Sequence, residues 1–220
     1  MTKYNLILAD PPWKQKRGGK KKARPGSSGK PLPYSTLDMK AIKAFLKAAQ
    51  DLGAKNHVLF LWAVEKHLPE AETMAAELGY KKHIRIIWSK RTGPAPAFTF
   101  RFTHEYLIFF YQGKLPAFAR DQRGKWASVI NETPTQHSTK PQISYAMLEA
   151  IYPGARRLEL FARQRRIGWD AWGDEVKSDI SLQPKRRVDS KTTRVEGGVD
   201  SKTAKLKEGK KHGTRRQGSF

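Results

Sequence analysis

Short apolar segments that read as strands alternate along this chain with amphipathic segments that read as helices. Expected strands cover residues 4–9, 57–64, 83–88, 103–111 and 157–161. Expected helices cover residues 38–52, 69–78 and 141–152, and they end at Gly53, at Gly79 and before Pro153-Gly154, residue types that commonly terminate helices. This alternation predicts an α/β fold: a doubly wound, mostly parallel sheet with helices on both faces.

The first expected strand runs directly into Asp10-Pro11-Pro12-Trp13. A carboxylate followed by two prolines and an indole predicts a stiff, aromatic-walled notch at the carboxyl edge of the sheet, where open α/β folds bind their ligands. The alternative is a turn that ends the strand and carries an incidental tryptophan. The four residue types together favour a seat for a flat base that bears an amino group.

The exocyclic amine of adenine is a weak nucleophile because its lone pair is delocalised into the ring. Asp10 and the carbonyl of Pro11 can both accept its protons while the nitrogen turns toward an electrophile. Trp13 offers a face on which a flipped base can stack, a contact worth roughly 1–3 kcal/mol. We therefore expect chemistry on an amino group at this edge.

Seven separated segments, in a shared order, resemble the MT-A70 family of S-adenosylmethionine-dependent N6-adenine methyltransferases over about residues 4–176. They are residues 8–13, 32–36, 59–62, 104–105, 137–141, 159–163 and 172–175. The resemblance implies a Rossmann-like class I methyltransferase fold, circularly permuted so that the catalytic strand comes first. It also implies S-adenosyl-L-methionine as cofactor, in-line methyl transfer, and catalytic roles for Asp10, Pro11, Pro12 and Trp13.

Lys140 stands at the N-terminus of the expected helix 141–152, where a cation opposes the helix dipole and therefore needs an anion nearby or exposure to solvent. The resemblance implies that this anion is the carboxylate of the cofactor. It further implies that residues from two later segments bind the cofactor: Glu159, Phe161, Arg163, Arg165, Arg166, Asp174 and Glu175. The mRNA methyltransferase of the family has His and Asn at the positions of Arg165 and Arg166, and the family pattern has Asn at the position of Asp174. Glu159 as a structural acid is the alternative to its ligand role.

The net charge of +23 is concentrated in two segments. Residues 14–30 carry eight lysines and arginines with no acid, and residues 177–220 carry thirteen against five acids. We interpret residues 14–33 as a basic flap inserted beside the active site, and residues 177–220 as a disordered basic tail, leaving a methyltransferase domain at residues 1–176. A tail that is only a solvated linker is the alternative; phosphate binding is the reading we prefer.

Further residues are expected on the substrate side. Tyr34 matches a gate tyrosine of the family, with packing against the base of the flap as its alternative. Basic residues expected to contact nucleic acid are Lys14, Lys20, Lys21, Lys22, Arg24, Lys90 and Arg91. Glu105, an acid inside an apolar strand, requires a charged partner such as Lys140 or Arg101. Trp62 and Trp88 are expected in the core.

Composition excludes several classes of protein. The chain has no cysteine and no apolar run of about 18 residues, so disulfide scaffolds and membrane spans are not expected, and its histidines show no metal-site spacing. We expect a cytoplasmic enzyme of a bacterial or phage-infected cell, without metal, acting as a monomer or homodimer. DNA is the preferred substrate, with relaxed sequence specificity; RNA, or a catalytically inert nucleic-acid-binding partner on the same fold, are the alternatives.

Overall fold

The computed structural model describes residues 3–14, 36–91, 100–134 and 139–183. Its seven strands are β1 (Tyr4–Ala9), β2 (Gly53–Ala63), β3 (Lys81–Ser89), β4 (His104–Gln112), β5 (Val129–Asn131), β6 (Arg157–Leu160) and β7 (Trp169–Trp172). The helices are α1 (Met39–Leu52), α2 (Leu68–Glu77) and α3 (Gln142–Ile151), with short 3-10 turns η1 (Glu65–His67) and η2 (Arg120–Gln122). All five expected strands and all three expected helices are therefore present.

The strands form one sheet in the order β5-β3-β4-β2-β1-β6-β7. β1 lies in its interior, parallel to β2 on one side and to β6 on the other. β4 alone runs against its two neighbours, β2 and β3. The predicted doubly wound, mostly parallel α/β fold is thus confirmed. After β1 the chain forms β2 on one side of β1, and it forms β6 on the other side of β1 only much later. The strand order therefore reverses between β1 and β6. Open α/β folds bind ligands at such a topological switch point.

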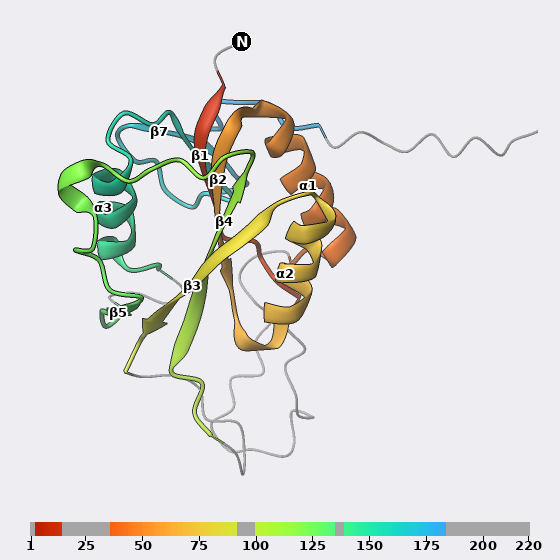
Figure 1. Ribbon diagram of the computed structural model, residues 1–220. Coiled ribbons are helices and arrows are strands. Elements are labelled where there is room, and N and C mark those ends of the chain that lie inside the picture. The colour runs from red at the N-terminus through yellow and green to blue at the C-terminus, as the bar shows by residue number, and fades with distance from the viewer. Residues whose placement is uncertain (1–2, 15–35, 92–99, 135–138, 184–220) are drawn as a thin grey trace, which may run out of the picture. The chain divides into compact units, whose positions relative to one another are not determined.

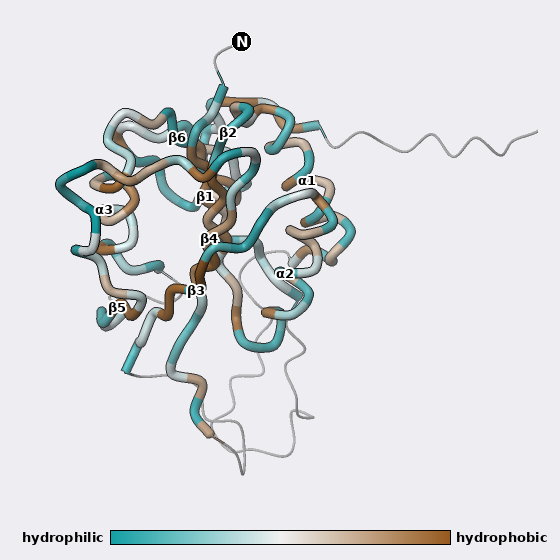
Figure 2. The backbone as a smooth tube through the Cα atoms, in the orientation of Figure 1, coloured by the Kyte–Doolittle hydropathy of each residue, from teal (hydrophilic) through white to brown (hydrophobic). Residues whose placement is uncertain are grey.

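Helices cover both faces of the sheet (Figure 1). α1 and α2 pack on one face, where Ile42, Leu46 and Met74 meet inward residues such as Ile7 and Leu59. On the other face, α3 packs through its own apolar residues against a second core built around Leu6, Leu8 and Trp62. Figure 2 shows the most hydrophobic residues along the central strands. Each fully buried aliphatic side chain contributes about 1.5–3 kcal/mol, so the two cores hold β1 rigidly from both sides.

The helix ends follow local chemistry. Asp38 caps α1 because its Oδ1 accepts the backbone N–H of Ala41 at 2.8 Å. Gly79 closes the turn after α2 with φ +84°, as expected of a glycine that terminates a helix. Gly53 differs: it is extended and begins β2. A side chain there would meet the ring of His57, since a Cβ would lie 2.7 Å from its Cε1.

Three features were not predicted. β5 and β7 are too short to show an alternation of their own, and β2 begins four residues before the expected strand. The expected domain boundary after residue 176 also lies too early. Leu182 is buried in the core and the Asp179 N–H donates to the Ala171 carbonyl at 2.8 Å, so the packed chain continues past β7. Two apolar residues, Ile180 and Leu182, pack this otherwise polar segment against the core. The average composition of the segment does not reveal them. Residues 184–220 of the expected tail lie outside the described residues.

Among the described residues, no helix combines the length and the apolar character that crossing a membrane requires.

Candidate active site

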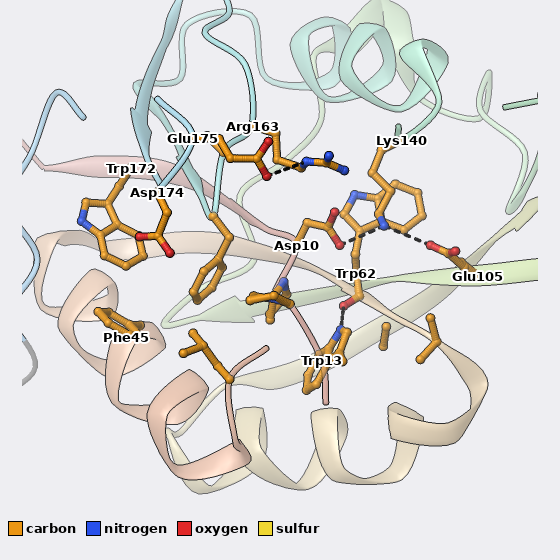
Figure 3. Close-up of a pocket in the computed structure, with 17 residues that line it drawn as sticks. Asp10, Trp13, Phe45, Trp62, Glu105, Lys140, Arg163, Trp172, Asp174 and Glu175 are labelled. Atoms are coloured by element: carbon orange, nitrogen blue, oxygen red, sulfur yellow. Dashed lines mark hydrogen bonds and ion pairs between the residues drawn. The ribbon is translucent and has the colours of Figure 1, made fainter. Parts of the chain in front are cut away.

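A cavity of about 500 Å³ opens at the carboxyl ends of β1, β2 and β6, at the switch point (Figure 3). Asp10, the first residue after β1, faces into it. The lining combines a few charged groups with many aromatic and apolar ones: Asp10, Pro11, Pro12, Trp13, Leu37, Phe45, Trp62, Ala63, Val64, Glu105, Lys140, Phe161, Ala162, Arg163, Trp172, Asp174 and Glu175. Its size and composition are those of a site for a cofactor or small ligand.

The Asp-Pro-Pro-Trp turn is held by main-chain hydrogen bonds. The Pro11 carbonyl accepts the Trp13 N–H at 2.8 Å, and the Pro12 carbonyl accepts the Leu37 N–H at 2.9 Å. A carbonyl oxygen has two acceptor positions, so Pro11 retains one for a ligand. The indole N–H of Trp13 donates to the Trp62 carbonyl at 3.0 Å. The turn therefore presents Asp10 on a rigid support.

Trp13 differs from the expected stacking surface. Its side chain is only 5% exposed, and the ring of His67 stacks on it with centroids 5.4 Å apart and planes 17° from parallel. His67 Nε2 also lies 2.9 Å from the Lys14 carbonyl. Trp13 lines the cavity, but the ring of a protein residue already occupies one of its faces. The indole belongs to the core cluster that also contains Ala9, Ala63 and Leu68.

A chain of alternating charges leads from Asp10 into the wall of the cavity. Lys140 Nζ lies 2.9 Å from Asp10 Oδ1 and 3.0 Å from Glu105 Oε2, and Lys90 Nζ lies 2.9 Å from Glu105 Oε1. The Lys140 ammonium also sits over the Trp62 ring, 5.4 Å from its centroid. The expected pairing of Glu105 with Lys140 is confirmed, and Lys90 is a second partner. The anions that the position of Lys140 requires are thus two carboxylates of the chain itself.

The pKa values in this chain follow from burial and pairing. Burial raises the pKa of Asp10, and the adjacent Lys140 ammonium opposes that rise. Glu105 is buried too, yet Lys140 and Lys90 together hold its pKa below the ordinary value. For Lys140, burial favours the neutral amine, but Asp10 and Glu105 outweigh it and raise the pKa. Lys140 therefore stays charged and favours the ionised form of Asp10.

A second cavity of about 530 Å³ shares Asp10, Lys140, Phe161, Arg163 and Glu175 with the first, and its remaining lining is mostly polar. Here Tyr145 Oη donates to Glu159 Oε1 at 2.7 Å. Burial raises the pKa of Glu159 to about 7, although this hydrogen bond lowers it. The expected roles of Glu159 as ligand or structural acid are both compatible with a position that is buried, hydrogen-bonded and on the cavity wall.

The three arginines after β6 point to different partners. Arg163 Nε donates to Glu175 Oε1 at 2.9 Å, and both residues line the two cavities. Arg165 instead binds the segment after β7, through Asp179 Oδ1 at 2.6 Å and the Lys177 carbonyl at 2.9 Å. Arg166 stacks over the Tyr145 ring at 4.0 Å. All three line the second cavity, but Arg165 is already engaged in holding the segment after β7.

Two backbone features shape this side of the site. Phe161 has φ +61°, a conformation that is uncommon for an aromatic residue and that concentrates at functional sites. Gly173 packs so closely on Ala162 that a Cβ would lie 2.2 Å from its carbonyl oxygen. Asp174 and Glu175 follow directly, exposed at the mouth of the first cavity. The structure thus brings together every expected cofactor-side residue at one edge of the sheet.

The substrate-side residues are less fully placed. Tyr34, Lys20, Lys21, Lys22 and Arg24 lie outside the described residues. Lys14 is exposed next to Trp13. Lys90 turns inward to Glu105 and its side chain is only 15% exposed. Arg91 is exposed and has φ +59°. Their roles as substrate contacts remain predictions.

Sequence reasoning missed several residues of the site. Phe45 lies in the expected helix 38–52 and was not expected at the site, but it meets Trp172 with ring centroids 4.6 Å apart and lines the cavity. Tyr145 and His67 carried no motif. Glu132 accepts the N–H groups of Gln142 and Ile143 at 2.7 and 3.0 Å, and so caps α3 behind Lys140. Of these residues, only Phe45 had a signal in the sequence, because its spacing places it on the same helix face as the apolar core positions.

Comparison with known proteins agrees with the geometry. A family model for MT-A70 matches residues 4–175. The chain is 29% identical over 208 residues to the type II methyltransferase M.MunI from a Mycoplasma species, covering 85% of this chain and 84% of that protein. It is 28% identical to the N6-methyladenosine RNA methyltransferase MTA1 of Pyricularia oryzae, covering 79% of this chain and 47% of that protein. It is 26% identical to the human N(6)-adenosine-methyltransferase catalytic subunit METTL3, covering 84% of this chain and 30% of that protein.

The chain therefore spans most of the first of these relatives and less than half of the other two. The family match covers well over half of the chain and ends within the segment that carries Asp174 and Glu175. Together with the sheet topology and the Asp-Pro-Pro-Trp turn at the switch point, it identifies the chain as a member of the MT-A70 family of S-adenosylmethionine-dependent N6-adenine methyltransferases.

Proposed function

We propose that this protein transfers a methyl group from S-adenosylmethionine to the N6 amine of adenine in DNA, with relaxed sequence specificity. The observation that carries the proposal is Asp10, a carboxylate on a rigid turn that faces a ligand-sized cavity and is paired with Lys140 at 2.9 Å. An acceptor for the amine protons and a charged group for an amino-acid ligand thus lie next to each other.

The residues of the two cavities suit the cofactor. Phe45, Phe161 and Trp172 provide aromatic surface for its adenine, beside the carboxylates of Asp174 and Glu175. The Arg163–Glu175 pair provides polar partners for ribose hydroxyls. Lys140 provides a cation for the carboxylate of the cofactor's amino-acid end. We assign the cofactor to this edge, with its methionine end toward β1.

When bound, S-adenosylmethionine supplies an electrophilic methyl group. Asp10 and the free acceptor position of the Pro11 carbonyl bind the two protons of the target amine and aim its nitrogen at that methyl. Asp10 would accept the proton that the target amine releases when it is methylated, so that the product leaves as a neutral amine. Burial raises the pKa of Asp10, and the Lys140 ammonium opposes that rise and so favours the ionised carboxylate that this role requires. Because no covalent enzyme intermediate is needed, the residues act through orientation and electrostatics.

DNA is the substrate that we favour. The chain covers 84% of a type II methyltransferase, but only 47% of the relative that is named as an RNA methyltransferase. Phosphate contacts of a chain with net charge +23 supply affinity without sequence information, which supports relaxed specificity. The corresponding location is the cytoplasm of a bacterial or phage-infected cell. RNA methylation is the second candidate, favoured by the relative of that description.

The test is to incubate the protein and S-adenosylmethionine with DNA and RNA in parallel and to quantify N6-methyladenine nucleosides by mass spectrometry. We expect methylated deoxyadenosine from wild-type protein and a loss of about 10²–10⁴-fold or more in Asp10→Ala. Asp51→Ala is the matched control, since that carboxylate forms only an exposed pair with Lys47. Calorimetry should show cofactor binding nearly intact in Asp10→Ala. Product from Asp10→Ala at the wild-type rate refutes the proposed role, and product in RNA alone reverses the substrate assignment.

A further inference from the structure

The ends of β3 and β4 that lie beside the active site carry an unusual surface. The two strands pair up to Ser89 and His104, and the Lys90 N–H then donates to the Thr103 carbonyl at 2.8 Å. The antiparallel pairing therefore continues one residue past the sheet. Arg91 and Phe102 are the next residues on the two sides, so the ladder brings them close together.

Phe100 and Phe102 are exposed there, at 91% and 46% of their surface. Within the described part of the chain, every other phenylalanine, tyrosine and tryptophan is buried or half-buried. Arg101 between them is exposed as well. Single exposed apolar residues are ordinary, but two phenylalanines that flank an arginine combine flat apolar surface with positive charge.

This surface is close to the reacting groups. Glu105, which holds Lys140 against Asp10, is three residues from Phe102. Three residues span at most about 10 Å, so Phe102 is close enough to the cavity for one nucleic-acid strand to contact both. Arg91, with its uncommon φ of +59°, adds a second exposed cation on the adjacent strand end.

We propose that Phe100 and Phe102 are a stacking site for unpaired bases next to the target adenine, with Arg101 and Arg91 binding the phosphates of the same strand. The inference rests on the proposed function, to which it adds the form of the substrate: a single-stranded or locally opened segment. Aromatic side chains interleaved with cations are the pattern by which proteins hold single strands without reading their sequence. A protein partner is less suited to this surface, because arginines on both strand ends would have to be neutralised.

The experiment measures binding of a fluorescein-labelled, adenine-containing 12-nucleotide single strand by anisotropy, at several salt concentrations. The variants are Phe100→Ala/Phe102→Ala and Arg101→Gln. Leu115→Ala is the matched control, because Leu115 is an exposed apolar residue just beyond the opposite end of β4. Calorimetric binding of S-adenosylmethionine reports whether each variant keeps its fold, and sedimentation reports its oligomeric state.

We expect the phenylalanine variant to bind the strand about fivefold or more weakly, with an unchanged dependence of affinity on salt, because stacking releases no counterions. Arg101→Gln should lower the slope of log K against log salt by about 0.7, the value for one phosphate contact on a single strand. Leu115→Ala should bind as wild type does.

Equal affinity of the phenylalanine variant and wild type overturns the inference. So does a wild-type protein that does not bind the single strand, or a variant that changes oligomeric state while its affinity for the strand is unchanged, which assigns the surface to protein contacts. Failure of the proposed function is a separate result: phenylalanine-dependent binding without any methylated adenine would leave the stacking site in place and remove the enzymatic assignment.

Discussion

Lys140 Nζ lies 2.9 Å from Asp10 Oδ1 and 3.0 Å from Glu105 Oε2, so one ammonium group joins two carboxylates in the wall of the cavity. Lys140 lies two residues before α3, Asp10 directly follows β1, and Glu105 lies in β4, so no two of them are near each other in the sequence. This relationship decides both the charge of Asp10 and the position of the cation that we assign to the cofactor.

Lys140→Ala should weaken binding of S-adenosylmethionine at least tenfold, because it removes the cation that we propose for the methionine carboxylate. It should also destabilise the fold by about 3–5 kcal/mol, since Asp10 and Glu105 lose their shared partner. Calorimetry and urea unfolding measure the two effects. Lys140→Arg keeps the charge in case the alanine variant does not fold, and Lys47→Ala is the exposed control. An unchanged dissociation constant would count against the assignment of Lys140.

His67→Ala should slow methyl transfer about tenfold while the affinity for S-adenosylmethionine stays nearly constant. The reason is that His67 supports Trp13 by stacking and binds the Lys14 carbonyl, yet it does not line the cavity. Initial rates and calorimetry measure the two quantities. His67→Phe retains a ring but no hydrogen bond, so it should recover part of the rate. Identical rates for the alanine and phenylalanine variants would show that the stack does not position the turn.

Glu159→Gln should stabilise the protein above neutral pH. The folded state keeps the Glu159 proton up to about pH 7, whereas the ordinary pKa is 4.5, so between these values the folded state binds more protons than the unfolded chain. Stability is therefore lost as pH rises through that window, on the order of 3 kcal/mol in total, and the glutamine variant avoids this loss. Melting temperatures at pH 4.5 and pH 8 should differ between variant and wild type only at the higher pH. A constant difference would refute the assignment.

Gly173→Ala should destabilise the fold by about 1–3 kcal/mol and weaken cofactor binding, because a Cβ would lie 2.2 Å from the Ala162 carbonyl oxygen. The loop that carries Asp174 and Glu175 would have to move. Gly154→Ala is the matched control, since a Cβ there meets no atom within 4 Å. Thermal unfolding and calorimetry test both expectations, and equal behaviour of the two variants would contradict them.

The sequence by itself determined the order of the main elements and the place of the Asp-Pro-Pro-Trp turn. Residues 4–9 are a nearly continuous apolar run, and residues 157–160 alternate polar and apolar side chains. Asp38, Gly79 and Pro141 mark helix ends by local chemistry. These features could be predicted because they depend mainly on residues that are close together in the sequence. The sequence also predicted that Glu105 needs a cationic partner, since burying an unpaired carboxylate in an apolar strand costs free energy.

Only the tertiary structure decided which surfaces those residues present. Trp13 is buried against His67, Arg165 is committed to Asp179, and Lys90 turns inward to Glu105, although each was expected at a ligand. Their partners lie 14 to 54 residues away in the sequence. Local sequence sets backbone preference, whereas the pairing of side chains depends on which distant strands the sheet places side by side, and that is a property of the whole fold.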